Sequence, residues 1–292
     1  MRIRPRVDVI LCCYNQEQFI SKAIESILCQ KVDADVRVIV ADDFSTDNTL
    51  NIVKSYEEES PFPFVYLQDS VNVGLHANYH RAFATCQGDY TAILEGDDWW
   101  RGVNHLSQHV TFLSQHRRYS MSFNRMSYYF QNDKESLTRS WPYAKTEYVT
   151  IHLNEQICFG NQIGNLSACV FKTKLLQSLP EDFFKLNYAD WELGMMMALH
   201  GPIAMLCECT SVYRINDKGQ WSSLSNDEKV SSELQTLENV RKFLPSYCSR
   251  YIKSYKHALL SGQEVSYSMP WWYRIRRYAM SKLKNGWSLR TK

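Results

Sequence analysis

The sequence predicts an α/β fold: a mostly parallel, Rossmann-like sheet flanked by helices, with a helical extension at the C-terminus. Two observations predict it. Short apolar stretches rich in β-branched residues alternate with segments of helical period through about the first 105 residues, which is the βαβ rhythm of a parallel sheet. The 292 residues are 45% hydrophobic and 22% charged, an ordinary globular composition that excludes a disordered or fibrous chain.

The first predicted strands are buried apolar runs that end in polar residues. They cover residues 7–13, 36–40, 64–67 and 90–94. Three predicted helices lie between them. Residues 18–30 have apolar side chains at 20, 23, 24, 27 and 28, the 3.6-residue period of a helix. Ser45 to Asn48 is typical of a helix start, and residues 76–86 form the third helix.

The pattern is looser after residue 105. We expect a helix over 105–115, a strand over 119–130, a polar loop over 132–145, a strand over 168–171, a helix over 189–200, a strand region over 202–213, and helical structure from about 230 to the end. The chain then has three parts. Residues 1–105 and 106–228 are the two halves of one domain, and residues 229–292 are a basic, aromatic tail.

Polar clusters follow three of the predicted strands. They are Tyr14-Asn15, Asp42-Asp43 and the acidic turn that begins at Glu95. Ligands of open parallel sheets bind beyond the carboxyl ends of the strands, so we expect the clusters to converge on one crevice. Asp and Asn also cap helices in such loops, and capping is the alternative for each cluster taken alone.

The acidic turn is a candidate metal site. Glu95, Asp97 and Asp98 place three carboxylates within four residues, and Gly96 lets the backbone turn tightly. Charges this close repel one another, and a divalent cation would relieve the repulsion. The alternative is an exposed acidic turn, against which the adjacent Trp99-Trp100 argues. The sequence has no G-x-G-x-x-G and no P-loop, so a cation is also the obvious means of neutralising nucleotide phosphates.

Four segments share their order and spacing with a known family. They run from Val9 to Asn15, from Val40 to Thr49, from Asn72 to Asn78 and from Gly88 to Trp100. They resemble the family 2, GT-A-type glycosyltransferases of bacterial surface polysaccharides. The resemblance covers about the first 105 residues. Weaker similarity at 189–193, 213–214 and 221–222 extends it to about residue 225.

The resemblance implies a donor site. The nucleotide sugar would contact Cys13, Tyr14, Asn15, Glu17, Asp42, Asp43, Gly74, Asn78, Glu95, Gly96 and Asp97. Asp42 or Asp43 would accept the ring N–H of a uracil, and Glu95 would approach the ribose. Asp97, with Asp98 beside it, would hold Mn²⁺ or Mg²⁺ against the diphosphate and so neutralise the departing group.

The resemblance also implies an acceptor site. Asp190 would be the base that takes the proton of the acceptor hydroxyl, in a direct displacement that inverts the anomeric carbon. The alternative for Asp190 is to cap the helix that follows it. Trp191 would stack on a sugar face, and Asn165, Ser167 and Trp221 would line the acceptor side.

The chain departs from the family pattern at several positions. Cys12-Cys13 stands where Pro-Thr is common, and we interpret the pair as buried core rather than as a nucleophile. Ala77 stands where a basic residue is frequent. His76 or Arg81 would then have to substitute for it in base recognition.

Charge is unevenly distributed in the chain. Residues 241–292 carry twelve Lys and Arg against one acid, and the first 240 residues have a net charge of −9. Within 270–284, aromatic and basic residues interleave at helical spacing, which suits a helix lying on a membrane surface. The alternatives are packing on the acidic first part and nucleic-acid binding. We expect no nucleic-acid partner, because no recognised module accompanies the charge.

The expected location is the cytoplasm, either free or peripheral on the cytoplasmic face of the inner membrane. No apolar run approaches the roughly 20 residues of a membrane helix. Nine cysteines without a C-x-x-C pair favour a reducing compartment.

These features together predict an inverting, metal-dependent glycosyltransferase. It would move a sugar from a nucleotide sugar, UDP-linked, to a glycan or lipid-linked glycan in polysaccharide biosynthesis. Two other functions remain open. One is a nucleotide-sugar-binding protein of the same fold without turnover. The other is a Mg²⁺-dependent nucleotidyltransferase, which would carry a Gly-rich, basic phosphate loop after the first strand, and residues 13–16 are no such loop.

Overall fold

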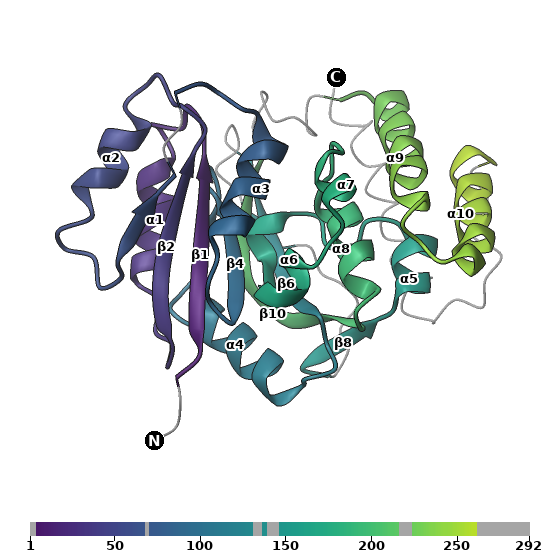
Figure 1. Ribbon diagram of the computed structural model, residues 1–292, viewed down its shortest axis with the longest axis horizontal. Coiled ribbons are helices and arrows are strands. Elements are labelled where there is room, and N and C mark those ends of the chain that lie inside the picture. The colour runs from purple at the N-terminus through teal and green to yellow at the C-terminus, as the bar shows by residue number, and fades with distance from the viewer. Residues whose placement is uncertain (1–3, 68–69, 131–135, 139–145, 216–223, 262–292) are drawn as a thin grey trace.

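One continuous sheet with helices on both faces forms the centre of the protein (Figure 1). The structure, a computed structural model, describes residues 4–67, 70–130, 136–138, 146–215 and 224–261. Trp221 and the segment 270–284, predicted to contact acceptor and membrane, lie outside the described residues. Among the described helices, none has the length and apolar character that crossing a membrane requires.

Four parallel strands make up the half of the sheet that the sequence predicts most clearly. Their order is β3-β2-β1-β4. Their bounds are Arg6–Cys13 for β1, Asp35–Asp42 for β2, Phe64–Tyr66 for β3 and Tyr90–Glu95 for β4. In register, Cys13 of β1 pairs with Asp42 of β2, and Cys12 pairs with Glu95 of β4. The polar clusters that follow β1, β2 and β4 therefore lie together at the carboxyl ends of these strands.

Beyond β4 the sheet is mixed. It continues in the order β9-β6-β10-β5, while β7 pairs with β6 and β8 pairs with β10. The bounds are Trp99–Trp100 for β5, Met121–Phe130 for β6, Ser136–Thr138 for β7, Tyr148–Ile151 for β8, Cys169–Lys172 for β9 and Ile203–Ile215 for β10. β9 runs antiparallel to both β4 and β6, whereas β10 runs parallel to β6. Strands from before and after residue 105, the predicted boundary between the two halves of the domain, thus belong to one sheet.

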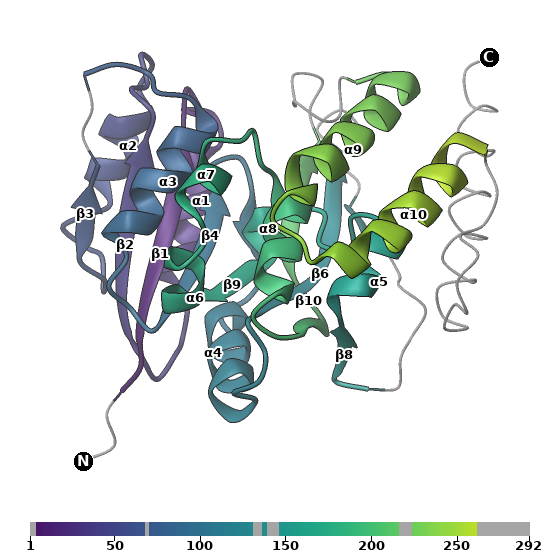
Figure 2. The same cartoon turned by 45° about the vertical axis from the view of Figure 1, so that its right-hand side comes forward.

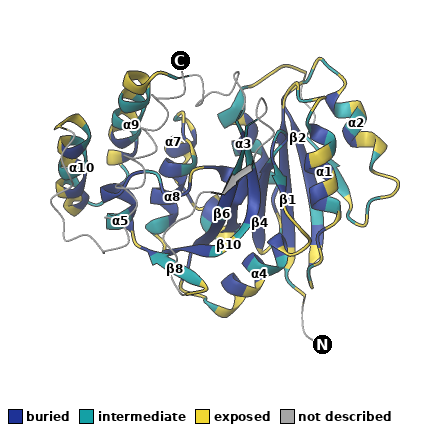
Figure 3. Ribbon diagram, turned by 180° about the vertical axis from the view of Figure 1, so that it is seen from behind, coloured by how far each residue is buried: buried dark blue, intermediate teal, exposed yellow. Residues whose placement is uncertain are grey.

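The two faces of the sheet are covered by different helices. α1, α2 and α4 cover one face, and α3 and α5 to α10 cover the other, as the two views in Figure 1 and Figure 2 show. The bounds are Ile20–Leu28 for α1, Thr49–Ser55 for α2, Leu75–Thr85 for α3, His105–Gln115 for α4, Leu153–Cys158 for α5, Thr173–Gln177 for α6, Glu181–Phe184 for α7, Asp190–Ala198 for α8, Asn226–Arg241 for α9 and Ser249–Ser261 for α10. Successive side chains of β1 alternate between the faces, so that Leu11 packs toward α1 and Ile10 toward α3. Figure 3 shows the result, a mostly buried sheet with the exposed residues on the outer sides of the helices and in the loops.

The structure adds short elements that the sequence did not predict. β5, β8, α5, α6 and α7 have two to six residues each, too few for a period to register. The predicted polar loop at 132–145 contains β7, and its other residues lie outside the described ones. The helical region expected from 230 is divided into α9 and α10. A short 3₁₀ turn, Ser246–Cys248, separates them after Pro245, because proline cannot donate the next helical hydrogen bond.

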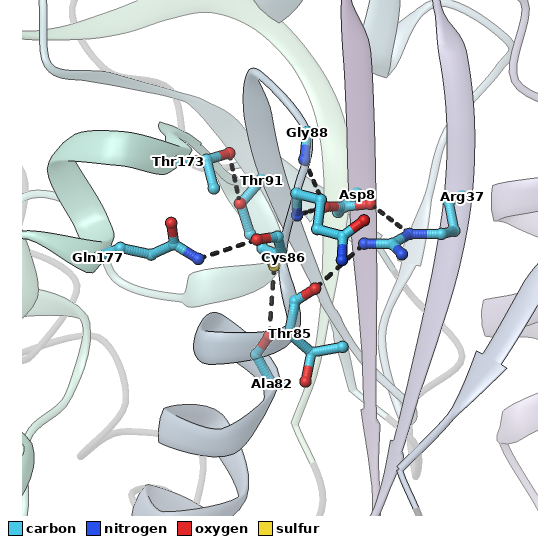
Figure 4. Close-up of polar contacts among 10 residues, drawn as sticks. Asp8, Arg37, Ala82, Thr85, Cys86, Gly88, Thr91, Thr173 and Gln177 are labelled. Carbon is cyan, nitrogen blue, oxygen red and sulfur yellow. Dashed lines mark hydrogen bonds and ion pairs between the residues drawn. The ribbon is translucent and has the colours of Figure 1, made fainter.

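A polar network fixes the amino ends of the parallel strands, opposite the crevice (Figure 4). The Asp8 carboxylate is buried and forms an ion pair with Arg37, with Nε and Oδ1 2.8 Å apart. Its other oxygen accepts the backbone N–H groups of Gln87 and Gly88 just before β4. Arg37 also donates to the carbonyl of Thr85 at the end of α3. These bonds fix the segment that leads into β4 against β1 and β2.

Candidate functional site

Reciprocal hydrogen bonds join the turns that follow β1 and β2. The Asn15 side-chain oxygen accepts the backbone N–H of Thr46 at 2.8 Å, and the Ser45 hydroxyl accepts the N–H of Asn15 at 2.9 Å. The Glu17 carboxylate accepts the N–H of Asn48 at 3.0 Å. The side chains of Asn15 and Glu17, predicted to contact the nucleotide, therefore fix one turn against the other.

Both aspartates after β2 are buried and hydrogen-bonded. Asp42 accepts the backbone N–H of Ser45 at 3.0 Å and its hydroxyl at 2.5 Å, and the thiol of Cys13 lies 3.6 Å from the same carboxylate. Asp43 accepts two successive N–H groups, the second from Gly74 at 2.9 Å. Asp42 shapes its own turn, and Asp43 fastens the loop before α3 to the end of β2.

The first turns of α3 are anchored to the same strand. Gly74 precedes the helix with φ +86°, in the left-handed region that favours glycine. Asn78 is buried and donates to the carbonyl of Ala41 at 2.7 Å. Arg81 donates from Nε to Asn78 and from Nη2 to the carbonyl of Asp42, both at 2.8 Å.

The acidic turn after β4 brings three carboxylates together. One oxygen from each of Glu95, Asp97 and Asp98 lies within 4.8 Å of the others. The hydroxyl of Tyr79 donates to Glu95 at 2.6 Å. Within the described part of the chain, no hydrogen bond joins the Asp97 carboxylate to another residue. A Cβ on Gly96 would overlap the surrounding side chains, which explains the glycine.

Asp98 is the most constrained of the three carboxylates. It is 1% exposed and accepts Asn165 Nδ2 at 2.9 Å and Ser167 Oγ at 2.6 Å on one oxygen. Its other oxygen accepts the backbone N–H of Arg214 at 2.9 Å. Asn165 and Ser167, predicted to line the acceptor side, are buried and hold Asp98 in place.

The carboxylates of this turn perturb one another. Burial, followed by repulsion from Asp97, raises the pKa of Glu95 to about 7. Burial is also the main cause of the raised pKa of Asp97 and of Asp98, and repulsion from both neighbours adds to the shift at Asp98. A divalent cation prefers such hard oxygen ligands and would offset their repulsion. The donor set therefore fits Mn²⁺ or Mg²⁺.

Cations and aromatic rings flank the acidic turn. Arg214 donates from Nε to the carbonyl of Asp97 at 2.8 Å, and its guanidinium carbon lies 5.0 Å from the centre of the Trp99 ring. The ammonium of Lys22 lies 3.7 Å from the centre of the same ring. Cation–π attraction holds both charges against the Trp99 ring. Burial raises the pKa of Asp97, and the charge of Arg214 opposes this shift.

Asp190, the predicted base, is the first residue of α8 and lies near the acidic turn. Its carboxylate accepts Asn161 Nδ2 at 2.8 Å. Burial raises the pKa of Asp190, and the hydrogen bond from Asn161 opposes the shift. The charge of Asp190 in turn contributes to the raised pKa values of Glu95 and Tyr213. A fourth carboxylate, oriented by its own asparagine, thus lies close enough to the acidic turn to act on Glu95.

Trp191 does not fit the acceptor role predicted for it. It is 3% exposed, and its indole N–H donates to the carbonyl of Gln156 at 2.8 Å. The edge of its ring packs against Tyr255 of α10. Both ring faces are enclosed in the core, so neither is free to stack on a sugar in this conformation.

Two residues that position the site were not singled out from the sequence. The first is Tyr79, whose hydroxyl donates to Glu95. The second is Asn161, whose side-chain N–H donates to Asp190 and whose side-chain oxygen accepts the N–H groups of Ile163 and Gly164. In the sequence, Tyr79 lies among apolar helix positions and is typical of a core residue, and Asn161 follows a glycine and is typical of a turn. No local signal therefore marks either residue.

Comparison with known proteins identifies relatives of the chain. The family described as glycosyl transferase family 2 matches residues 8–170. An uncharacterized protein of Mycobacterium tuberculosis is 29% identical over 226 residues, which are 76% of this chain and 62% of that protein. The putative glycosyltransferase EpsE of Bacillus subtilis is 36% identical over 121 residues, 41% of this chain and 43% of EpsE. The chain thus spans less than two thirds of the length of these relatives.

Solved structures share the fold at low sequence identity. S. aureus TarS 1–349 in complex with UDP-GlcNAc superposes with a TM-score of 0.65 at 18% identity, over 89% of this chain and 74% of that one. The mannosyltransferase PcManGT from Pyrobaculum calidifontis, in complex with GDP-Man and Mn²⁺, superposes with a TM-score of 0.61 at 16% identity, over 97% of this chain and 81% of that one.

Proposed function

The chain belongs to glycosyl transferase family 2 and has the GT-A fold, and from that premise we propose that it transfers a sugar from a nucleotide sugar to a hydroxyl group of a glycan or lipid-linked glycan in polysaccharide biosynthesis. The donor is a uridine diphosphate sugar, and the reaction inverts the anomeric carbon. Four carboxylates at the edge of the sheet carry the proposal: Glu95, Asp97 and Asp98 on one turn and Asp190 opposite them.

The donor binds across the carboxyl ends of β2, β1 and β4. Tyr14 is exposed at the end of β1 and contacts the base, and the two aspartates after β2 hold the turn that bounds the base pocket. Asp97 is half-buried, whereas Asp98 beside it is fully buried, so the Asp97 carboxylate is the more open of the two to a ligand. Asp97, Glu95 and Asp98 would together hold Mn²⁺ or Mg²⁺, which would neutralise the charge that develops on the leaving diphosphate.

Asp190 acts as the general base. Its carboxylate takes the proton of the acceptor hydroxyl while the acceptor oxygen bonds to the anomeric carbon from the side opposite the diphosphate. The bond from that carbon to the diphosphate oxygen breaks in the same step, and the bonding electron pair leaves with the nucleoside diphosphate. The fixed hydrogen bond from Asn161 orients the carboxylate for this transfer.

Paired substitutions test the metal and base roles separately. Binding of nucleoside diphosphates with and without Mn²⁺ is measured by thermal stabilisation, because a ligand of the folded state must raise its stability. Release of nucleoside diphosphate from a panel of nucleotide sugars measures turnover. Asp97→Asn should lose the Mn²⁺-dependent part of binding. Asp190→Asn should keep binding and lose about 10²- to 10⁴-fold in turnover.

Asp182→Asn is the matched control, since Asp182 is exposed and paired only with Lys185 among the described residues. It should leave both measurements unchanged. Binding of a nucleotide by the unaltered chain without turnover on any donor and acceptor would favour a binding protein of the same fold. Turnover that survives Asp190→Asn would refute the assignment of the base.

A further inference from the structure

Phe44 is held in a strained backbone conformation in the turn that follows β2. Its φ is +62°, in the left-handed region that costs free energy for any residue with a Cβ. Asn15 has the one other positive φ among the described non-glycine residues. Asparagine tolerates this region through local hydrogen bonds, and Asn15 makes such a bond to Thr46. A phenylalanine side chain offers no such compensation.

The surrounding turn imposes this conformation. Asp42 on one side accepts two hydrogen bonds from Ser45, and Asp43 is tied to the loop that ends at Gly74. Asp42 and Asp43 are 6% and 4% exposed, whereas Phe44 is 45% exposed. The fold is thus destabilised by a conformation that leaves a large apolar ring exposed to solvent. Strain of this kind concentrates at functional sites.

A second exposed aromatic residue lies on the neighbouring turn, after β1. Tyr14 is 46% exposed and follows Cys13, the register partner of Asp42. Neighbouring strands are about 4.8 Å apart, so both side chains rise from adjacent strand ends. Neither ring contacts another aromatic ring in the part of the chain that the structure describes. The polar side chains of the two turns hydrogen-bond to each other. The two exposed rings are therefore the side chains there that can contact a ligand.

We propose that Phe44 contacts the nucleobase of the donor and, with Tyr14, forms an aromatic clamp on it. The inference rests on the proposed function, because it requires a nucleotide in the crevice. The acidic turn lies at the end of β4, and Phe44 lies at the end of β2, on the far side of β1. A nucleoside diphosphate bound with its phosphates at the acidic turn would extend its base across β1 toward Phe44. Aromatic side chains bind bases through stacking whatever their sequence context.

Phe44→Gly gives a test in which stability and binding move in opposite directions. Glycine adopts φ +62° without strain, so the melting temperature of the unliganded variant should equal or exceed that of the unaltered chain. Loss of base stacking should weaken binding of UDP in the presence of Mn²⁺ by about 5- to 150-fold. Inorganic pyrophosphate with Mn²⁺, which lacks a base, should bind both proteins equally.

Three further variants complete the design. Phe44→Tyr keeps an aromatic ring and should bind UDP within about twofold of the unaltered chain, a difference of less than 1 kcal/mol. Phe44→Asn tolerates the same backbone and should behave as the glycine variant. Tyr247→Ala removes an exposed ring from the turn before α10 and should change nothing.

Equal UDP affinity in Phe44→Gly and the unaltered chain would overturn the inference and leave the proposed function intact. Equal losses for UDP and pyrophosphate would also overturn it, because they would place the effect at the phosphates. Failure of the unaltered chain to bind UDP, GDP, ADP or dTDP would overturn both.

Discussion

Protonation of His109 should destabilise the protein as the pH falls below 6.5. The side chain is 0% exposed, its Nδ1 lies 2.8 Å from the Ser122 hydroxyl, and its Nε2 has no hydrogen-bond partner among the described residues. The neighbouring ring of His105, 4.7 Å away between ring centres, is likewise buried. Burial lowers the pKa of His109 from 6.5 to about 3, because a charged imidazolium there would lose its hydration without a counter-ion.

The magnitude follows from proton linkage. Since the folded pKa lies below the unfolded one, the contribution of the neutral ring is complete above pH 6.5 and is lost as the pH falls toward 3. Each pH unit well inside that window costs about 1.4 kcal/mol. Between pH 7 and pH 5, where the unfolded chain becomes largely protonated and the folded chain does not, the loss is about 1.9 kcal/mol.

His109→Gln isolates this contribution. The free energy of unfolding is measured by urea titration at pH 7 and pH 5 for the variant, the unaltered chain and His200→Gln, an exposed control. Glu95 titrates in the opposite sense, since its folded pKa is raised to about 7 and acid therefore favours the folded state, but this contribution is common to all three proteins. The unaltered chain and the control should lose about 1.9 kcal/mol more than the variant. Parallel pH dependence in all three would refute the reasoning.

Three further substitutions probe the framework of the site. Asp8→Asn keeps one oxygen and turns an amide N–H₂ either to the backbone donors or to the arginine drawn beside it in Figure 4, and should lower the free energy of unfolding by about 1–3 kcal/mol in urea titration. Gly96→Ala places a Cβ 2.8 Å from Cδ1 of Ile20 and 3.1 Å from Cβ of Cys13, both buried and unable to move freely, and calorimetry should find it destabilised by about 1–3 kcal/mol; equal melting temperatures would contradict the packing. Asn161→Ala frees the Asp190 carboxylate, and steady-state kinetics should find kcat about 10- to 100-fold lower with the donor KM unchanged.

The parallel half of the fold could be predicted because its strands are buried on both faces. Such strands read as continuous apolar runs, and residues 7–13 and 36–40 are of this kind. The mixed half could not be predicted to the same degree. β9 inserts between β4 and β6, antiparallel to both, and nothing in its four residues specifies partners about 50 and 80 positions away in the chain.

In the site, the positions of the motif residues follow from the local sequence, whereas the partners of their side chains depend on distant segments. The motif residues at the strand ends could be found from the sequence, since the strands fix where they lie. Whether a side chain there faces a ligand or its neighbours depends on the partner turn. The hydrogen bonds of Asn15 to residue 46 and of Asn165 to Asp98 pair segments far apart in the chain, and composition carries no trace of them.

Arg81 places a positive charge near position 77, where this chain has alanine and the family pattern often has a basic residue. Positions 77 and 81 are four residues apart on α3 and therefore lie on one face of the helix. The guanidinium of Arg81 donates to the carbonyl of Asp42 at 2.8 Å, and its Nε donates to the side-chain oxygen of Asn78. A positive charge thus lies at the end of β2, beside the turn that presents Phe44. Arg81 is one of the two residues expected to replace the basic residue that is frequent at position 77, and its role in base recognition stays a prediction.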